Sequence, residues 1–241
     1  MPIVSTTERA FDVDVVVFDK DGTLVDLDAV WFPPAQGWVE AVASGDTELA
    51  DGLSRLLGID LPGRRLVPDG IAAASTFGDI RSTTAGALAA RSWQADRIAA
   101  ALDRAAAAVD GALRSAEPVL LADVPALFSS LTAGGLQLAL LTSDDRQPTL
   151  DFLGWLGADH LLDMVVTASD VEHPKPHPDG LQRIADGLSL PTDRILMVGD
   201  SVFDHQAARA AGAWFVSVGR DTGASKLADA SVDCIDQLTV G

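Results

Sequence analysis

The hydrophobic positions of this chain fall into short continuous apolar runs that alternate with longer stretches of helical spacing. Continuous runs rich in β-branched residues are typical of strands that are buried on both faces. The pattern predicts strands at 13–18, 136–142, 164–167, 195–198 and 214–218 and near 234–235, and helices at about 122–133, 148–156, 178–188 and 202–211. Strands that alternate with helices predict an α/β fold, in which helices cover both faces of a parallel sheet.

Residues 26–114 interrupt this alternation, because they contain helical stretches and no convincing strand. Within them, a proline pair occupies positions 33–34, and a break rich in Gly, Pro and Arg occupies 61–70. The clearest helical spacing is that of Ile98, Leu102, Ala105, Val109 and Leu113. We therefore expect two domains: an α/β core made of residues 1–25 and 115–241, and a helical domain inserted over 26–114.

The first predicted strand ends in two aspartates, Asp19 and Asp21, which are separated by one residue and followed by Gly22 and Thr23. Alternation along an extended chain places both carboxylates on the same side, and glycine lets the backbone turn sharply afterwards. Two carboxylates at the end of a buried strand are costly to desolvate, so we expect them to face a cleft and a cation. A simpler interpretation is an Asx-type turn, in which the carboxylates only cap the loop backbone.

Polar residues also follow other predicted strands. Thr142 and Ser143 follow the apolar run LQLALL at 136–141, Lys175 lies in the loop after the next strand, and Asp200 follows the strand after that. In open α/β sheets, ligands bind at the carboxyl ends of the strands. If these strands are neighbours, their polar ends converge with the two aspartates, which favours a functional site over a simple turn.

Composition narrows the functional classes. The chain has 241 residues, 48% of them hydrophobic, which is typical of a globular protein with a sizeable core. Its formal charge of −18 disfavours nucleic acid and anionic membranes as partners, because both require a cationic surface. No apolar run is long enough to span a membrane, no signal peptide is visible, and the single Cys234 excludes an internal disulfide. We therefore expect a cytoplasmic protein.

Four motifs carry a resemblance to a known family. They are DKDGT at 19–23, LLTS at 140–143, Lys175 within HPKPHPDG, and GDSVFD at 199–204. With these motifs in this order, the chain resembles the haloacid dehalogenase superfamily, specifically its phosphatase branch with a helical cap inserted after the first strand. The resemblance implies a Rossmann-like α/β core with the cap at 26–114, Mg²⁺ as cofactor and a small phosphorylated metabolite as substrate.

The resemblance also implies a role for each matching residue. Asp19 is expected to be the nucleophile that forms an aspartyl-phosphate, and Asp21 the general acid and base. Thr142 is expected to bind a phosphoryl oxygen, and Lys175 to pair with the phosphoryl group and with Asp19. Phosphoryl transfer depends mostly on positioning and charge stabilisation, and these residue types can supply both.

Metal and substrate binding follow from the same resemblance. Asp200 is expected to bind Mg²⁺ together with Asp19 and the backbone carbonyl of Asp21. Asp204 is expected to lie behind these ligands and to orient the motif lysine or a metal-bound water. Substrate binding is expected at Gly22, Thr23 and Ser143, since backbone N–H groups of a loop can hold a phosphate.

Some positions depart from the family's pattern or stand beside its motifs. Lys20 stands where relatives more often carry an apolar or aromatic residue, and by alternation we expect its side chain to point away from the carboxylates. Asp144 and Asp145 are interpreted as solvated residues at the start of a helix. His173 and His177 flank the motif lysine, but the prolines between them forbid a regular helix, so we interpret them as loop residues.

Several activities fit the core motifs to different degrees. A dehalogenase needs neither the second aspartate nor Mg²⁺, and a phosphonate-cleaving relative would need a lysine in the cap, where this chain has none. A phosphomutase similar to β-phosphoglucomutase keeps the same motifs and stays an alternative, as does a catalytically silent binding protein. The sequence favours a Mg²⁺-dependent phosphatase of small phosphomonoesters, similar to phosphoglycolate phosphatase, acting as a monomer or homodimer.

Overall fold

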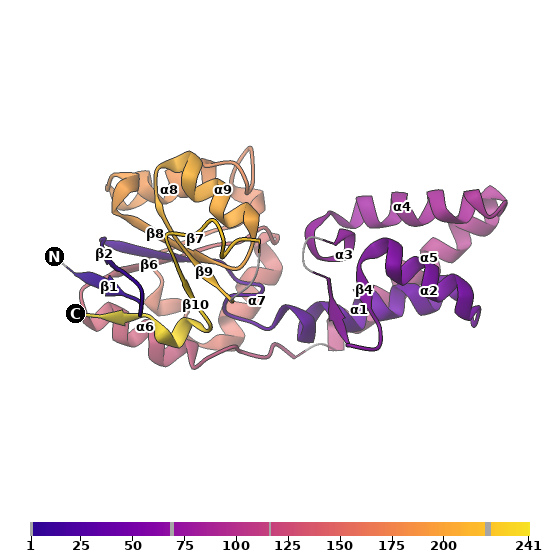
Figure 1. Ribbon diagram of the computed structural model, residues 1–241, viewed down its shortest axis with the longest axis horizontal. Helices are drawn as coiled ribbons and strands as arrows, with labels where there is room; N and C mark the ends of the chain where they lie inside the picture. The colour runs from indigo at the N-terminus through magenta and orange to yellow at the C-terminus, as the bar shows by residue number, and fades with distance from the viewer. Residues whose placement is uncertain (1, 68–69, 116, 220–222) are drawn as a thin grey trace. The chain divides into compact units, whose positions relative to one another are not determined.

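The computed structural model describes residues 2–67, 70–115, 117–219 and 223–241 (Figure 1). The contacts divide the chain into two compact units. The core unit consists of Met1–Asp26 and Leu120–Gly241, and the helical unit consists of Leu27–Val119. That the two units fold as separate domains stays a prediction.

The central sheet of the core unit has the strand order β10-β9-β8-β3-β6-β7, and each neighbouring pair is parallel. Its strands are β3 Val15–Phe18, β6 Gln137–Leu141, β7 Met164–Val166, β8 Ile195–Gly199, β9 Trp214–Val218 and β10 Ala230–Val232. The predicted α/β class with a parallel sheet is confirmed. The chain runs from β3 outward to β6 and β7 and then returns to β8 on the other side of β3. The strand order therefore changes direction at β3, which is where ligands bind in such sheets.

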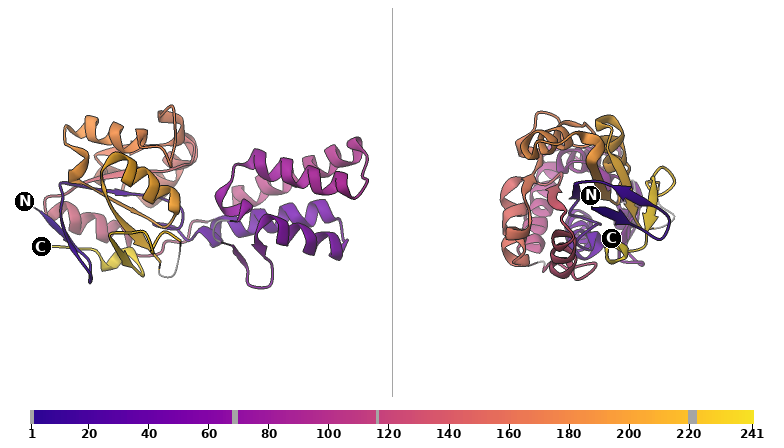
Figure 2. Two further views of the ribbon diagram at one scale, coloured as in Figure 1. Left: turned by 45° about the horizontal axis from the view of Figure 1, so that its top comes forward. Right: turned by 90° about the vertical axis from the view of Figure 1, so that its left-hand side faces the viewer.

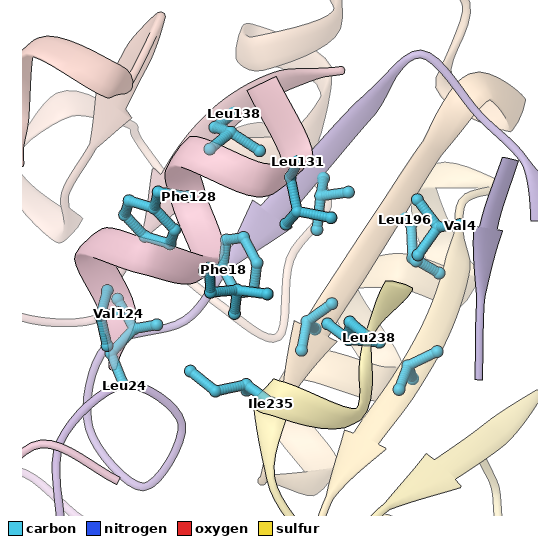
Figure 3. Packing of buried hydrophobic residues seen from close by; sticks show 14 of the residues in the cluster. Val4, Phe18, Leu24, Val124, Phe128, Leu131, Leu138, Leu196, Ile235 and Leu238 are labelled. Atoms are coloured by element: carbon cyan, nitrogen blue, oxygen red, sulfur yellow. The ribbon is translucent and has the colours of Figure 1, made fainter. Parts of the chain in front are cut away.

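Helices cover both faces of this sheet, because successive residues of a strand point to opposite sides. Phe18 of β3 packs in one core with α6 (Val124–Ala133) and α7 (Arg146–Leu156), and Figure 3 shows it beside Phe128 and Leu131. Val17 packs in the other core with α8 (Asp179–Leu188) and α9 (Val202–Ala211). In Figure 1, α8 and α9 lie on one side of the sheet and α6 lies on the other. Burial on both faces explains the continuous apolar run that predicted this strand.

The two ends of the chain pair with each other in a small antiparallel sheet of order β11-β1-β2. Its strands are β1 Ile3–Ser5, β2 Ala10–Asp12 and β11 Thr239–Val240. Val4 pairs with Phe11 on one side and with Val240 on the other. The two ends therefore lie side by side, as Figures 1 and 2 show. The hydrophobic pattern does not predict this sheet.

The predicted strand near 234–235 is wrong. Residues Ile235–Gln237 form a 3-10 turn, and the last strand of the large sheet is β10, a few residues earlier. Ile235 is apolar because it is buried in the same core as Phe18, and not because it belongs to the sheet. Further 3-10 turns lie at Asp159–Leu161, Ala168–Asp170 and Thr192–Arg194.

The helical unit has a hydrophobic core of its own, which includes Phe32, Trp38 and Leu88. Its helices are α1 Leu27–Ala43, α2 Thr47–Leu57, α3 Ile71–Ala74, α4 Phe77–Ala90 and α5 Ala95–Ser115. The expectation of no strand in this region is wrong, because β4 (Ile59–Asp60) and β5 (Arg65–Leu66) form a short antiparallel hairpin. In the parts of the chain that are described, no helix combines the length and the apolar character needed to cross a membrane.

Candidate active site

The loop after β3 forms the first part of the site. Asp19 extends the strand by one residue, since its backbone N–H donates to the Val198 carbonyl of β8 at 2.9 Å. A tight turn follows, in which the backbone N–H groups of Leu24 and Val25 both donate to the Lys20 carbonyl, at 2.8 and 3.1 Å. The position of Asp19 is thus fixed by the central strand, whereas the residues after it belong to a turn.

Two glycines let carboxylates approach the backbone closely. Gly22 has a φ of +79°, and a Cβ at this position would overlap the carboxylate of Asp200. A Cβ on Gly199, the last residue of β8, would overlap the carboxylate of Asp204. Because any side chain at either position would displace a carboxylate, both glycines have a direct steric role in the site.

Lys175 connects three segments that are far apart in the sequence. Its Nζ lies 2.6 Å from Asp19 Oδ1, 2.7 Å from Asp204 Oδ1 and 3.2 Å from the Leu141 carbonyl oxygen. The Lys175 side chain is 4% exposed, and that of Asp204 is fully buried. Burial lowers the pKa of Lys175, but the charges of Asp19 and Asp204 outweigh it and raise the pKa above its ordinary value. The ammonium therefore stays charged.

Asp19, Asp200 and Asp204 form a carboxylate cluster, in which one oxygen of each lies within 4.8 Å of the others. Burial raises the pKa of Asp19 to about 7, against the lowering effect of Lys175. Burial and the charges of Asp19 and Asp204 raise the pKa of Asp200 well above 3.8. One ammonium beside three carboxylates leaves an excess of negative charge, and carboxylate oxygens are ligands that Mg²⁺ prefers. This donor set fits a divalent cation bound by oxygen atoms.

Thr142 lies directly after β6, the strand beside β3, and is buried. Its N–H donates to the Val166 carbonyl at 3.0 Å, and its hydroxyl accepts from the Asp144 N–H at 3.1 Å. Thr23 is also buried, and its hydroxyl has no hydrogen-bond partner among the residues described. Ser143 is exposed. The roles of these residues in phosphate binding stay predictions.

The family model for haloacid dehalogenase-like hydrolases matches residues 13–212. The chain belongs to this family. Among curated relatives of this hydrolase, the phosphoglycolate phosphatase of Escherichia coli (strain K12) is 37% identical over 83 residues. That stretch covers 34% of this chain and 33% of the relative, so the match spans about a third of the curated protein.

Solved structures extend the similarity in fold to most of the hydrolase. A predicted phosphoglycolate phosphatase from Haemophilus somnus 129pt is 19% identical, with 93% of this chain and 95% of that chain covered and a TM-score of 0.66. The β-phosphoglucomutase from Clostridium difficile is 18% identical, with 93% and 92% covered and a TM-score of 0.58. At these identities, the similarity shows the fold alone.

In this hydrolase, Lys20 does not point away from the carboxylates, so the sequence prediction for its side chain is wrong. Its Nζ lies 2.7 Å from both carboxylate oxygens of Asp21 and 2.9 Å from Asp144 Oδ2. The turn after Asp19 ends the alternation of an extended strand, which is why the spacing rule fails here. The interpretation of Asp144 as a solvated residue is also wrong, whereas Asp145 is exposed as expected.

The sequence does contain a signal for this contact. An unexpected lysine follows one strand, and two additional aspartates follow the strand beside it, so their charges are complementary. The signal becomes specific only when the two strands are known to be neighbours. The side chain of Asp21 is thereby bonded to Lys20 and is not part of the carboxylate cluster defined above.

The two histidines beside the motif lysine lie in a loop, as predicted. Their Nδ1 atoms lie 3.1 Å (His173) and 2.7 Å (His177) from the carboxylate of Asp179, the first residue of α8. Both rings are about half exposed. These contacts attach the loop that carries Lys175 to the beginning of α8.

Proposed function

We propose that this hydrolase is a Mg²⁺-dependent phosphatase that cleaves small phosphomonoesters through an aspartyl-phosphate on Asp19. The observation that carries the proposal is the 2.6 Å contact between Lys175 Nζ and Asp19 Oδ1 within the carboxylate cluster. An ammonium beside the nucleophile offsets the repulsion between a carboxylate and an anionic phosphate. The partial similarity to the phosphoglycolate phosphatase of Escherichia coli supports 2-phosphoglycolate as a candidate substrate.

The reaction takes place in two transfers. In the first, Asp19 attacks phosphorus through Oδ2, since Oδ1 is bonded to Lys175, and the bond from phosphorus to the leaving oxygen breaks. Asp21 gives its proton to that oxygen, which therefore leaves as a hydroxyl group of the product and not as an alkoxide. In the second, Asp21 takes a proton from water as the water oxygen attacks phosphorus. The bond from phosphorus to Asp19 then breaks, which regenerates the carboxylate and releases phosphate.

Asp19, Asp200 and the backbone carbonyl of Asp21 would hold the Mg²⁺. When bound, the cation offsets the negative charge of the transferred phosphoryl group. Asp204 has a different role, because both of its oxygens are already bonded within the protein. Its Oδ1 accepts from Lys175, and its Oδ2 accepts from the backbone N–H and the hydroxyl of Ser201. We therefore assign Asp204 the positioning of Lys175.

The test is the release of inorganic phosphate from a panel of small phosphomonoesters that includes 2-phosphoglycolate, in Mg²⁺ and in EDTA. We expect turnover that requires Mg²⁺ and that falls at least about a thousandfold in Asp19→Asn, because the nucleophile is removed. Asp186→Asn alters an exposed aspartate of α8 and serves as the matched control with unchanged activity. Full activity of Asp19→Asn would exclude the proposed mechanism, and the absence of turnover across the panel would exclude the proposed function.

A phosphomutase is the alternative that a structural neighbour favours, since the β-phosphoglucomutase from Clostridium difficile has the same fold. A mutase would convert β-glucose 1-phosphate to glucose 6-phosphate with little release of phosphate. A catalytically silent binding protein would retain a phosphoester and not turn it over. The same panel, followed by measurements of product identity and of binding, distinguishes these outcomes.

A further inference from the structure

Each of the two aspartates in the DKDGT loop has a lysine of its own. Asp19 is bonded to Lys175, and Asp21 is bonded to Lys20. The chain contains only one other lysine, the exposed Lys226. The nucleophile and the proposed acid and base therefore do not compete for one ammonium, and each carboxylate has a separate cationic partner.

The contact between Lys20 and Asp21 restricts the carboxylate strongly. Both oxygens of Asp21 lie 2.7 Å from Lys20 Nζ, so the ammonium is bonded to the whole carboxylate and not to one edge of it. The Lys20 side chain is 8% exposed and that of Asp21 is 16% exposed, so water competes little for this pair. Rotation of the Asp21 carboxylate would break at least one of these short contacts.

Lys20 is itself held from the neighbouring strand. Asp144, in the loop after β6, places Oδ2 2.9 Å from Lys20 Nζ. The ring of Phe152, from α7, has its centroid 5.6 Å from the same atom. An ammonium has three donors, and here three carboxylate oxygens lie at hydrogen-bond distance, so its burial is compensated. The position of Lys20 is thus determined by groups outside the DKDGT loop.

We propose that Lys20, anchored by Asp144, is a positioning residue that orients the Asp21 carboxylate for proton transfer to the leaving group. This inference rests on the proposed function, because it assigns Asp21 the role of acid and base. A proton donor must lie on the line to the leaving oxygen, and misplacement by about 1 Å can cost about a hundredfold in rate. Lys20 does not contact the transferred group in this account, and it acts through Asp21.

The test compares two substrates that differ in their need for a proton. An alkyl phosphate releases a poor leaving group that must be protonated, whereas p-nitrophenyl phosphate releases a stable phenolate. We expect Lys20→Met to lower kcat/KM for the alkyl phosphate about 10- to 100-fold, a part of what general acid catalysis contributes. For p-nitrophenyl phosphate we expect less than about a threefold loss, since little proton transfer is needed.

Two further variants and a control complete the design. Lys20→Arg keeps the cation and is expected to restore most of the kcat/KM for the alkyl phosphate that Lys20→Met loses. Asp144→Asn keeps the contact of Lys20 with Asp21 but removes the charged anchor of Lys20. We therefore expect kcat/KM for the alkyl phosphate to fall, but by less than in Lys20→Met. Lys226→Met removes an exposed lysine and leaves the ratio between the substrates unchanged. Thermal unfolding of each variant identifies any that fails to fold, in which case Asp144→Asn and Lys20→Arg carry the test.

The outcomes separate this inference from the proposed function. If the wild-type protein is active and Asp19→Asn is inactive, equal losses for both substrates in Lys20→Met overturn the inference alone. Unchanged rates in Lys20→Met overturn it as well. If the wild-type protein turns over neither substrate, the proposed function fails, and the positioning role fails with it.

Discussion

Asp200 is partly buried beside two other carboxylates, whose charges the ammonium of Lys175 opposes. Burial, together with Asp19 and Asp204, raises the pKa of Asp200 well above its ordinary 3.8. A folded pKa above the unfolded value means that the folded protein binds this proton more tightly. The resulting stabilisation is fully present below pH 3.8 and is lost as the pH rises through the folded pKa. Above its folded pKa, the ionised Asp200 therefore costs the metal-free protein stability relative to lower pH.

Replacing this carboxylate is expected to stabilise the metal-free protein. In EDTA at pH 8, we expect Asp200→Asn to raise the free energy of unfolding by about 1–2 kcal/mol, and by less at pH 5. Mg²⁺ reverses the order, because the wild-type protein gains about 2.7 kcal/mol at a concentration one hundred times Kd and the variant gains little. Denaturant unfolding of both proteins at pH 5 and pH 8, with Mg²⁺ and with EDTA, measures these free energies of unfolding.

The control for this prediction is Asp186→Asn, which removes an exposed carboxylate of α8. We expect its stability to follow that of the wild-type protein at each pH. A lower stability of Asp200→Asn at both pH values in EDTA would show that the carboxylate is favourably bonded in the folded protein. The account of its raised pKa would then be wrong.

Two helices begin with the same hydrogen-bonded arrangement. At α9, the Ser201 hydroxyl accepts from the Asp204 N–H at 3.2 Å and donates to Asp204 Oδ2 at 2.6 Å. At α4, the Thr76 hydroxyl makes the same pair of bonds with Asp79, at 3.2 and 2.6 Å. Both are capping boxes, in which a side chain satisfies backbone donors at the helix start. Only the box of α9 also holds a carboxylate that is bonded to Lys175.

This difference predicts that loss of either cap lowers stability, whereas only loss of the α9 cap lowers activity. Ser201→Ala and Thr76→Ala are each expected to lower the free energy of unfolding by about 1 kcal/mol, through loss of the cap. Ser201→Ala is also expected to lower kcat about tenfold, because Asp204 loses the bond that fixes it beside Lys175. Phosphate release and urea unfolding on the two variants provide the measurements.

Ser201→Thr keeps the hydroxyl and is expected to restore both quantities. Equal activity of Ser201→Ala and Thr76→Ala would show that the cap of α9 serves stability alone. Loss of activity in Thr76→Ala without loss of stability would contradict the prediction that the α4 cap affects stability and not activity.

The elements that the sequence predicts well are those whose pattern is local. The strands β3, β6 and β8 are continuous apolar runs, since both of their faces are buried, and the helices that follow them have clear spacing. Strand β10 is missed because its three residues, Ala-Ser-Val, contain no apolar run. The small sheet is missed because Val4 and Val240 pair across nearly the whole chain, which no local pattern shows.

In the candidate site, too, some contacts follow from local sequence patterns and others depend on how distant segments are arranged. The convergence of Asp19, Lys175 and Asp200 follows from parallel strands whose carboxyl ends meet at one edge, so the sequence predicts it. The contact of Lys20 with Asp144 depends instead on the turn after β3 and on the strand order. Alternation describes extended chains only, and this turn begins one residue after the strand ends.

The two units have separate hydrophobic cores. Among the described residues, neither core of the core unit includes a member of the helical unit. The chain leaves the core unit after Asp26 and returns at Leu120. Val25, just before the exit, forms an antiparallel bridge with Leu120. The Leu121 N–H also donates to the Leu24 carbonyl at 3.0 Å. The core unit thus holds both crossing segments together by its own hydrogen bonds.

Removal of the helical unit is therefore expected to leave the core unit folded. In a variant that joins Asp26 to Leu120 through a short Gly-Ser linker, we expect cooperative thermal unfolding and a helix content that agrees with α6 to α9. A chain closure this short costs little entropy, because the bridge already brings the two ends together. Circular dichroism and a two-dimensional NMR spectrum measure both properties.

The control is the same linker inserted after Asp26 in the full chain, which tests whether the linker alone disturbs the bridge. A non-cooperative transition in the deletion variant, with a cooperative one in the control, would show that the core unit needs the helical unit to fold. The two units would then form a single folding domain.

The one cysteine of the chain lies at this same crossing. Cys234 is partly buried, and its Sγ lies 3.1 Å from the Leu121 carbonyl oxygen, directly after the bridge of Val25 with Leu120. A thiol-reactive fluorophore would therefore attach at one native position, with no substitution elsewhere. Its emission would report the environment of the two crossing segments, so the protein carries its own labelling site for spectroscopy.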